Sequence, residues 1–130
     1  MNTATSLSIL LVDDELELLT SLSMYLRVIG HNPWTAVSAD EAERLIRSNR
    51  FDLVICDVIM PQMSGLEFFQ RIKASMPSFP PFLFYSGVLD CPIKTPFEPG
   101  ILGFLQKPFS MTTLTDLLPK VTQIHSDRIG

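Results

Sequence analysis

Three apolar runs in this chain each end at charged residues, and this pattern limits the possible folds more than any other feature. The runs are Ile9–Val12 before Asp13 and Asp14, Phe51–Cys56 before Asp57, and Phe104–Gln106 before Lys107. A continuous apolar run is typical of a strand that is buried on both faces of a parallel sheet. Because parallel strands end at the same edge of a sheet, we expect the carboxylates and the lysine to meet in one crevice.

Strand-like and helix-like segments alternate along the chain, which predicts an α/β fold. The strands are expected at residues 9–12, 31–36, 51–56, 82–85 and 101–106. Pro33 favours an edge position for the second strand, because proline cannot donate to the hydrogen-bond ladder. Five βα units predict a parallel sheet with helices on both faces.

The helix boundaries have their own signals. Ser38 with Glu41, and Ser64 with Glu67, are predicted capping boxes, and Gly30 is a predicted C-terminal cap. Helical spacing predicts three buried faces: Leu19, Leu22, Leu26 and Ile29; Leu66, Phe69, Ile72 and Met76; and Leu114, Leu117, Leu118 and Val121.

Prolines interrupt the pattern in two places. Pro119 is expected to kink or shorten the last helix, which begins near Ser110. The fourth helix should lie between Ser86 and Ile101, but that segment holds Pro92, Pro96, Pro99 and Gly100. Since an interior proline costs a helix about 3 kcal/mol, we expect an irregular region with at most a turn or two of helix.

Composition excludes several classes of protein. The 130 residues suit one domain, and the 46% hydrophobic content suits a compact core. A net charge of −4 argues against direct contact with nucleic acid, and no apolar run approaches the roughly 20 residues of a membrane helix. Cys56 is expected to be a buried free thiol and Cys91 to lie in a loop, so a reducing cytoplasm is the expected location.

The charged residues suggest phosphoryl chemistry. Carboxylate oxygens in one crevice repel one another, and they suit Mg²⁺, which binds hard oxygen ligands. Asp57 is then available as a nucleophile toward a phosphoryl group, and Lys107 can balance the charge of the transferred oxygens. Ser86 ends the fourth strand and offers a hydroxyl to the same group.

Each of these residues also has a structural interpretation. Asp13 and Asp14 can favour a helix N-terminus, Asp57 can form a turn, and Lys107 can be a solvated surface charge. Taken singly, the structural interpretation is the more common one. Only the consistent placement of these groups at separate strand ends favours a common site.

The chain resembles the receiver domains of two-component response regulators from about Ser8 to Val121. The acidic pair Asp13-Asp14, the stretch from Asp57 through Met60-Pro61 to Gly65, Ser86, and Lys107-Pro108-Phe109 match the motifs of that family. The resemblance implies a flavodoxin-like (βα)5 fold with strand order 2-1-3-4-5. It also implies that a histidine kinase or a phosphotransfer protein phosphorylates Asp57.

The resemblance assigns further roles. Mg²⁺ would be held by Asp14, Asp57 and the backbone carbonyl of Ile59, with Asp13 acting through water. Ser86 and Phe104 occupy the positions whose side chains rearrange after phosphorylation. For Phe104, a place in the hydrophobic core is an equally good interpretation.

The expected function is therefore a phosphorylation-controlled interaction module that switches an output domain or a partner protein. Residues 1–130 are expected to form one domain, with its core at about 8–121 and a polar tail or linker at 122–130. The expected chemistry is self-catalysed phosphoryl uptake and loss rather than turnover of a substrate. Two alternatives are a degenerate receiver that acts as a scaffold and a phosphatase of the haloacid dehalogenase type. The phosphatase needs a second Asp two residues after the nucleophile, where this chain has Ile59.

Overall fold

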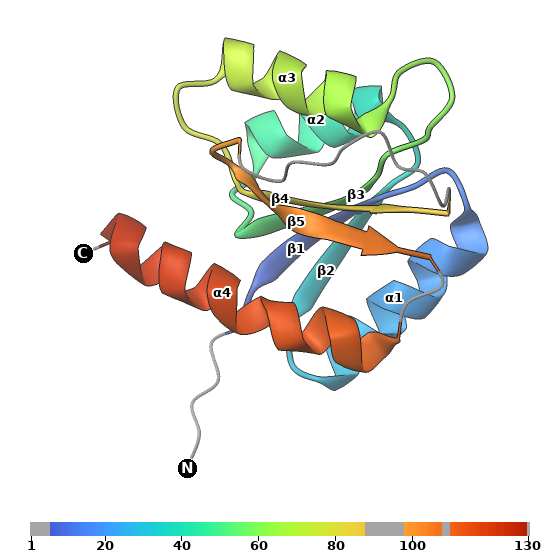
Figure 1. Cartoon of the computed structure of the whole chain (residues 1–130), viewed down its shortest axis with the longest axis vertical. Coiled ribbons are helices and arrows are strands. Elements are labelled where there is room, and N and C mark those ends of the chain that lie inside the picture. Colours follow the sequence, from blue (N-terminus) through green and yellow to red (C-terminus); the bar gives the residue numbers. More distant parts are fainter. Residues whose placement is uncertain (1–5, 88–97, 108–109, 130) are drawn as a thin grey trace.

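The computed structural model describes residues 6–87, 98–107 and 110–129 of the chain (Figure 1). Strands and helices alternate from β1 to β4 as the sequence predicts, and β5 is the next described element after β4. The elements are β1 (Ser8–Val12), α1 (Leu16–Val28), β2 (Asn32–Ala36), α2 (Ala39–Ser48), β3 (Leu53–Asp57), α3 (Gly65–Ser75), β4 (Phe82–Ser86), β5 (Ile101–Gln106) and α4 (Met111–Ile129).

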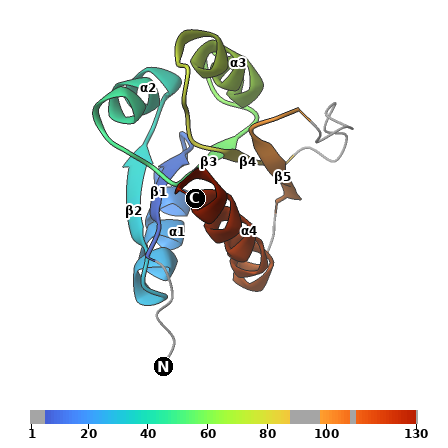
Figure 2. The same ribbon diagram turned by 90° about the vertical axis from the view of Figure 1, so that its left-hand side faces the viewer.

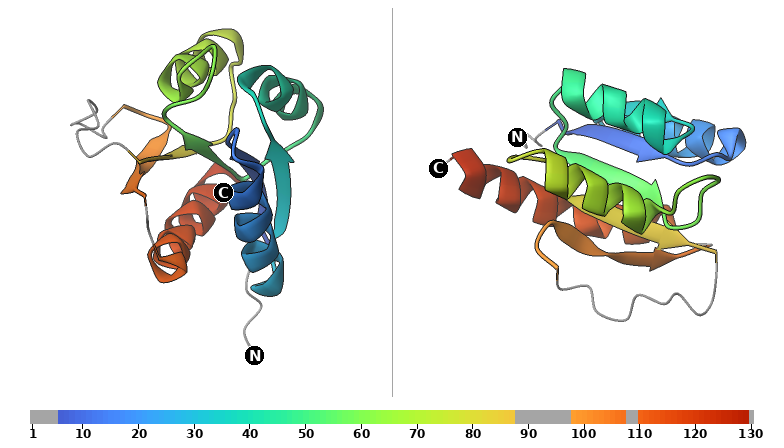
Figure 3. Two further views of the ribbon diagram at one scale, coloured as in Figure 1. Left: turned by 90° about the vertical axis from the view of Figure 1, so that its right-hand side faces the viewer. Right: turned by 90° about the horizontal axis from the view of Figure 1, so that it is seen from above.

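The five strands form one parallel sheet in the order β2-β1-β3-β4-β5, which confirms the predicted fold. Helices α1 and α4 cover one face of the sheet, and α2 and α3 cover the other (Figure 2). The strands seen from above in Figure 3 point the same way, so their carboxyl ends share one edge. This edge is where the charged residues were expected.

Burial on both faces explains the uninterrupted apolar strands. All five residues of β3 are buried, and alternate residues enter different cores. Leu53 and Ile55 join the core beneath α1 and α4, whereas Val54 and Cys56 join the core beneath α2 and α3. A central strand of a parallel sheet therefore needs apolar side chains at every position. Cys56 is the predicted buried free thiol, and Cys91 lies outside the described residues.

The sheet edge at β2 also matches the prediction. Pro33 is in β2, which pairs only with β1, so its missing N–H leaves no gap between two strands. The strand begins at Asn32, one residue later than the predicted start at His31.

Three helix ends can be compared with their predictions. Ser64 and Glu67 form a complete capping box at α3. Ser38 accepts a hydrogen bond from the Glu41 N–H, but the Glu41 carboxylate accepts from the N–H of Val37 instead of that of Ser38. The capping box predicted at α2 is therefore only half correct. Gly30 follows α1 with a φ of 99°, as a C-terminal glycine should.

Two predictions about buried faces need correction. In α3, Phe68 is fully buried beside Phe69 and Ile72, while Leu66 and Met76 are only half-buried. The buried residues Gly65, Phe68, Phe69 and Ile72 recur at i, i+3, i+4 and i+7, so the apolar stripe is rotated from the predicted one and includes Phe68. Leu114, Leu118 and Val121 of α4 are buried as predicted, and Ile29 and Leu117 are partly buried.

Pro119 was expected to kink or shorten the last helix; α4 continues through Pro119 to Ile129, so Pro119 does not shorten it. Pro119 is exposed, and the buried residues on either side of it keep the helix on the sheet. Most of the proline-rich segment expected to replace a regular helix, residues 88–97, lies outside the described residues. Within the described part of the chain, none of the helices is both long enough and apolar enough to cross a membrane.

Candidate functional site

Three aspartates meet at the carboxyl edge of the sheet, as the sequence predicts. Asp13 and Asp14 follow β1, and Asp57 ends β3. One carboxylate oxygen from each of the three lies within 4.8 Å of the others. Neighbouring parallel strands bring Asp57 to Asp13 and Asp14 although it lies more than 40 residues from them in the sequence.

Asp13 is completely buried and has several donors around its carboxylate. Its Oδ1 accepts a hydrogen bond of 2.8 Å from the backbone N–H of Glu15. Its Oδ2 accepts from the Tyr85 hydroxyl at 2.6 Å and from Lys107 Nζ at 3.2 Å. These three donors hold the buried carboxylate in one orientation.

Asp57 is 6% exposed, so little of its surface is open to solvent. Its Oδ1 accepts from the Ile59 N–H at 3.0 Å, and its Oδ2 accepts from Lys107 Nζ at 3.2 Å. Burial raises the pKa of Asp57, and the charge of Asp13 adds to this rise. The Ile59 N–H and the Lys107 charge oppose the rise without cancelling it.

Lys107 is the cation of the site. Its Nζ lies 3.2 Å from carboxylate oxygens of Asp13, Asp57 and Glu15. Burial acts to lower the pKa of Lys107, but attraction to Asp57 and Asp13 outweighs it and raises the pKa. The ammonium therefore stays charged and is shared among three carboxylates.

The loop between β3 and α3 brings the start of α3 close to Asp57. The Gly65 N–H donates to the Val58 carbonyl at 2.7 Å. A Cβ atom at Gly65 would collide with the backbone carbonyl oxygen of Asp57. Glycine at this position thus permits the close approach. The Ile59 side chain, in contrast, is 56% exposed beside the site.

Ser86 and Phe104 lie on neighbouring strands near this edge. Ser86 is buried at the end of β4, and its carbonyl accepts from the Lys107 N–H at 2.7 Å. Phe104 is half-buried on β5, and its ring stacks on that of Phe84 with 5.5 Å between centroids. Phe104 thus contacts the core beneath α2 and α3.

Sequence reasoning missed two residues of the site. Tyr85 was expected only as part of an apolar strand, but its hydroxyl reaches Asp13. Burial and the bond to Asp13 raise the pKa of Tyr85, so its hydroxyl is a permanent donor. Glu15 was not among the predicted site residues, but it contacts Lys107. The sequence carries no signal for the Tyr85 contact, because a tyrosine at the end of the apolar run from Phe82 fits a core position equally well.

The carboxylates fit a hard divalent cation. Asp14 is exposed, and in the described part of the chain no hydrogen bond or ion pair occupies its carboxylate. An accessible carboxylate next to two buried ones offers oxygen ligands and leaves room for water, which suits Mg²⁺. Lys107 offsets only part of the negative charge, so a further cation is electrostatically favourable there.

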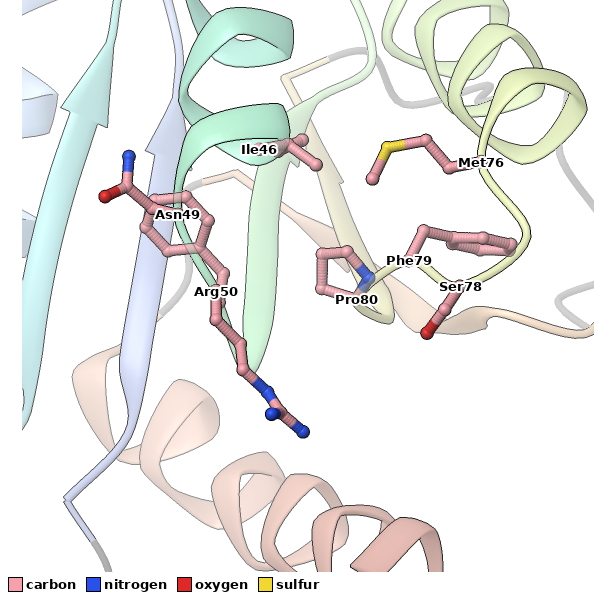
Figure 4. Close-up of a pocket in the computed structure, with 8 residues that line it drawn as sticks. Ile46, Asn49, Arg50, Met76, Ser78, Phe79 and Pro80 are labelled. Atoms are coloured by element: carbon pink, nitrogen blue, oxygen red, sulfur yellow. The ribbon is translucent and has the colours of Figure 1, made fainter.

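A pocket separate from the acidic cluster lies at the opposite edge of the sheet. It has a volume of about 330 Å³ and is lined by residues at the ends of α2 and α3 and before β3 and β4 (Figure 4). Arg50 is the only charged residue that lines it. None of its lining residues belongs to the acidic cluster, so it does not contribute to this chemistry.

Comparison with known proteins agrees with this geometry. The sequence model of the response regulator receiver domain matches residues 9–119. The transcriptional regulatory protein ZraR of Escherichia coli is 35% identical over 127 residues, which cover 95% of this chain and 28% of ZraR. This chain therefore spans about a quarter of that relative.

Solved structures show the same fold. The signal receiver domain of an HD domain-containing protein from Pseudomonas fluorescens is 30% identical and superposes with a TM-score of 0.82, covering 98% of this chain and 96% of that one. The response regulator TrrA of Thermotoga maritima, solved in complex with Mg²⁺-BeF, is 26% identical with a TM-score of 0.76 and covers 88% of this chain and 97% of its own.

Proposed function

The chain belongs to the family of response regulator receiver domains, and on that premise we propose that Asp57 is its phosphoryl acceptor. The observation that carries the proposal is the position of the Asp57 carboxylate, which contacts the Lys107 ammonium and lies within 4.8 Å of carboxylate oxygens of Asp13 and Asp14. A receiver of this kind acts in two-component signalling and is not a classical enzyme. The phosphoryl uptake and loss described below are part of the proposal.

In the proposed reaction, Asp57 attacks the phosphorus atom of a phosphodonor. A carboxylate oxygen forms the new O–P bond while the bond from phosphorus to the donor breaks, and the leaving atom keeps that electron pair. Asp57 reacts as the anion, so no proton has to leave it. Water later attacks the acyl phosphate, which restores Asp57 and releases inorganic phosphate.

The metal-binding roles are also proposed. Asp14, Asp57 and the backbone carbonyl of Ile59 would hold Mg²⁺ directly, and Asp13 would act through water. Two observations support this division: Asp14 is exposed, while three protein donors already occupy the buried Asp13. When bound, Mg²⁺ would neutralise charge on the transferred phosphoryl oxygens.

The acid cluster and Lys107 would then respond to the new charge. A phosphoryl group adds about −1.5 to −2 charges near neutral pH. Lys107 can turn toward this group, because it is shared among three carboxylates rather than bound to one. We propose that Ser86 donates to the same group and that Phe104 changes its packing against Phe84 as the site rearranges.

Receiver domains interact with histidine kinases and output domains. For this chain we propose a histidine kinase or a histidine phosphotransfer protein as donor, and an output domain or downstream protein as target. ZraR is named a transcriptional regulatory protein. The net charge of −4 supports the proposal that this receiver does not itself contact nucleic acid. We further propose residues 1–130 as one receiver domain that acts in the cytoplasm.

Mass spectrometry of the intact protein tests the proposed function. The wild type is expected to gain one phosphoryl group from a small phosphodonor with Mg²⁺ and none with a chelator. Asp57→Asn should gain none, and Asp40→Asn, which removes an exposed carboxylate outside the cluster, should behave as the wild type. A wild type that takes up no phosphoryl group would indicate a scaffold. Rapid release of phosphate over many turnovers would indicate a phosphatase.

A further inference from the structure

A buried tyrosine on β4 binds directly to the acidic cluster. The Tyr85 hydroxyl donates to Asp13 Oδ2 at 2.6 Å, the shortest side-chain hydrogen bond that the described residues make to any of the three aspartates. Tyr85 is fully buried. A buried hydroxyl that donates to a charged carboxylate makes a stronger bond than one between neutral groups.

Strand register explains why Tyr85 can reach Asp13. Val12 pairs with Cys56, and Asp57 pairs with Tyr85. Asp13, Asp57 and Tyr85 therefore form one row across three neighbouring strands. Since side chains along a strand alternate between faces, all three belong to the face covered by α1 and α4. The long tyrosine side chain extends across β3, and its hydroxyl contacts Asp13 just after the end of β1.

The ring of Tyr85 contacts the cation of the site as well. Lys107 Nζ lies 4.7 Å from the ring centroid, which is a cation–π contact. The same side chain thus holds Asp13 through its hydroxyl and Lys107 through its ring. Lys107 is also shared with Asp57 and Glu15, whereas the Tyr85 hydroxyl has Asp13 as its acceptor.

We propose that Tyr85 is a positioning residue of the phosphoryl-transfer site, which keeps Asp13 oriented and so frees Lys107 to turn toward the phosphoryl group. This inference rests on the proposed function. Without the hydroxyl, Lys107 would be the one remaining donor to Asp13 Oδ2 among the residues that the structure describes. With its hydroxyl in place, Tyr85 would influence Mg²⁺ binding through Asp13, as residues that hydrogen-bond to metal-binding carboxylates do.

The Tyr85→Phe variant tests the inference, because it removes the hydroxyl and keeps the ring. We expect its dissociation constant for Mg²⁺, measured by isothermal titration calorimetry without a phosphodonor, to rise about tenfold. Tyr25→Phe is the matched control. The Tyr25 hydroxyl makes a bond of the same 2.6 Å length, but to Thr115 Oγ1, away from the acids. This control should bind Mg²⁺ as the wild type does.

A second measurement does not depend on the folding of Tyr85→Phe. The chain has two tyrosines, so Tyr85 is the only one left in Tyr25→Phe. When that variant is labelled with 3-fluorotyrosine, its single ¹⁹F resonance reports on Tyr85. We expect the resonance to shift on Mg²⁺ addition, with the midpoint that calorimetry gives.

Three results would overturn the inference. Tyr85→Phe could bind Mg²⁺ as tightly as the wild type, or Tyr25→Phe could lose as much Mg²⁺ affinity as Tyr85→Phe. The third is a ¹⁹F resonance that does not shift when Mg²⁺ is added. If one of these results is obtained and the wild type still takes up a phosphoryl group on Asp57, only the proposed role of Tyr85 is disproved. A wild type that neither binds Mg²⁺ nor accepts a phosphoryl group would remove the proposed function, and the inference with it.

Discussion

Asp57 is the residue at which stability and function conflict most clearly. Its carboxylate is nearly buried, and the charges of Asp13 and Asp14 are close to it. Lys107 compensates for part of this repulsion at 3.2 Å, but the ammonium is shared with Asp13 and Glu15. A reactive carboxylate is therefore kept at a position where its charge is unfavourable for the fold.

This conflict predicts that Asp57→Asn stabilises the protein without Mg²⁺ near neutral pH. We expect its melting temperature to exceed that of the wild type by about 3–6 °C, which corresponds to roughly 1 kcal/mol for a domain of this size. Asparagine removes the charge and can still accept from the Ile59 N–H. Asp40→Asn, which removes a carboxylate that is 68% exposed, should change the melting temperature little.

The difference in stability between Asp57→Asn and the wild type should also depend on pH. Because folding raises the pKa of Asp57 above its ordinary value of 3.8, the folded wild type binds this proton more tightly than the unfolded chain does. The resulting stabilisation is present below pH 3.8 and is lost as the pH rises through the folded pKa. The gain in stability of Asp57→Asn over the wild type should therefore grow as the pH rises from 3.8 through the folded pKa of Asp57. A constant or shrinking advantage would contradict this account.

The residues of the site differ in how far the sequence revealed them. Asp13, Asp57 and Lys107 could be predicted, because each ends an apolar run and strand ends converge in a parallel sheet. Tyr85 could not, since a tyrosine inside an apolar strand fits a simple core position. Its contact with Asp13 depends on the register of three strands, and the sequence does not contain that register explicitly.

At the level of elements, the connection from β3 to α3 controls how closely the helix approaches Asp57. Gly65→Ala is expected to lower the free energy of unfolding by about 1–3 kcal/mol, because the new Cβ would collide with the Asp57 backbone carbonyl. Alanine favours helices over glycine by about 0.8–1.0 kcal/mol at an interior position. A net loss, measured by chemical denaturation, would show that close approach dominates.

Gly87→Ala is the matched control for this prediction. A Cβ at Gly87 would lie 3.9 Å from the nearest neighbouring atom, Cδ of Lys107, which is an ordinary contact. We expect its effect on the free energy of unfolding to stay within about 0.5 kcal/mol. If Gly65→Ala were as stable as Gly87→Ala, the steric account of this connection would fail.

The elements themselves were largely predictable. Buried parallel strands have unbroken apolar runs, and the Ser64–Glu67 signal correctly located the start of α3. Local signals failed where tertiary contacts decide the result. The Glu41 carboxylate bonds to Val37, and packing on the sheet carries α4 past Pro119. Helix propensity and capping describe only the chain near a residue, whereas these outcomes depend on contacts with the sheet.

At the scale of the whole molecule, the parallel sheet gathers groups from β1, β3, β4 and β5 at one edge. The fold class followed from the alternation of elements, but the strand order came from the family resemblance. The reason is that alternation permits several orders of a doubly wound sheet. The gathered acids make the folded chain a better Mg²⁺ ligand than the unfolded one, which links metal binding to global stability.

This linkage predicts that Mg²⁺ stabilises the folded protein. At 100 times its dissociation constant, a ligand that binds only the folded state adds about 2.7 kcal/mol. We expect thermal denaturation to show this gain for the wild type and for Asp40→Asn. Asp14→Asn should lose most of it, since it removes the exposed carboxylate of the cluster. An equal gain in Asp14→Asn would place the metal elsewhere.

The position of the phosphoryl group is the most direct test of the central claim. After Mg²⁺-dependent phosphorylation, borohydride reduces an aspartyl phosphate to homoserine, and peptide mass spectrometry then identifies the modified residue. Our account predicts homoserine at position 57 in the wild type and at no other aspartate. Homoserine at position 13 or 14, or a phosphoryl group that remains on Ser86, would contradict it.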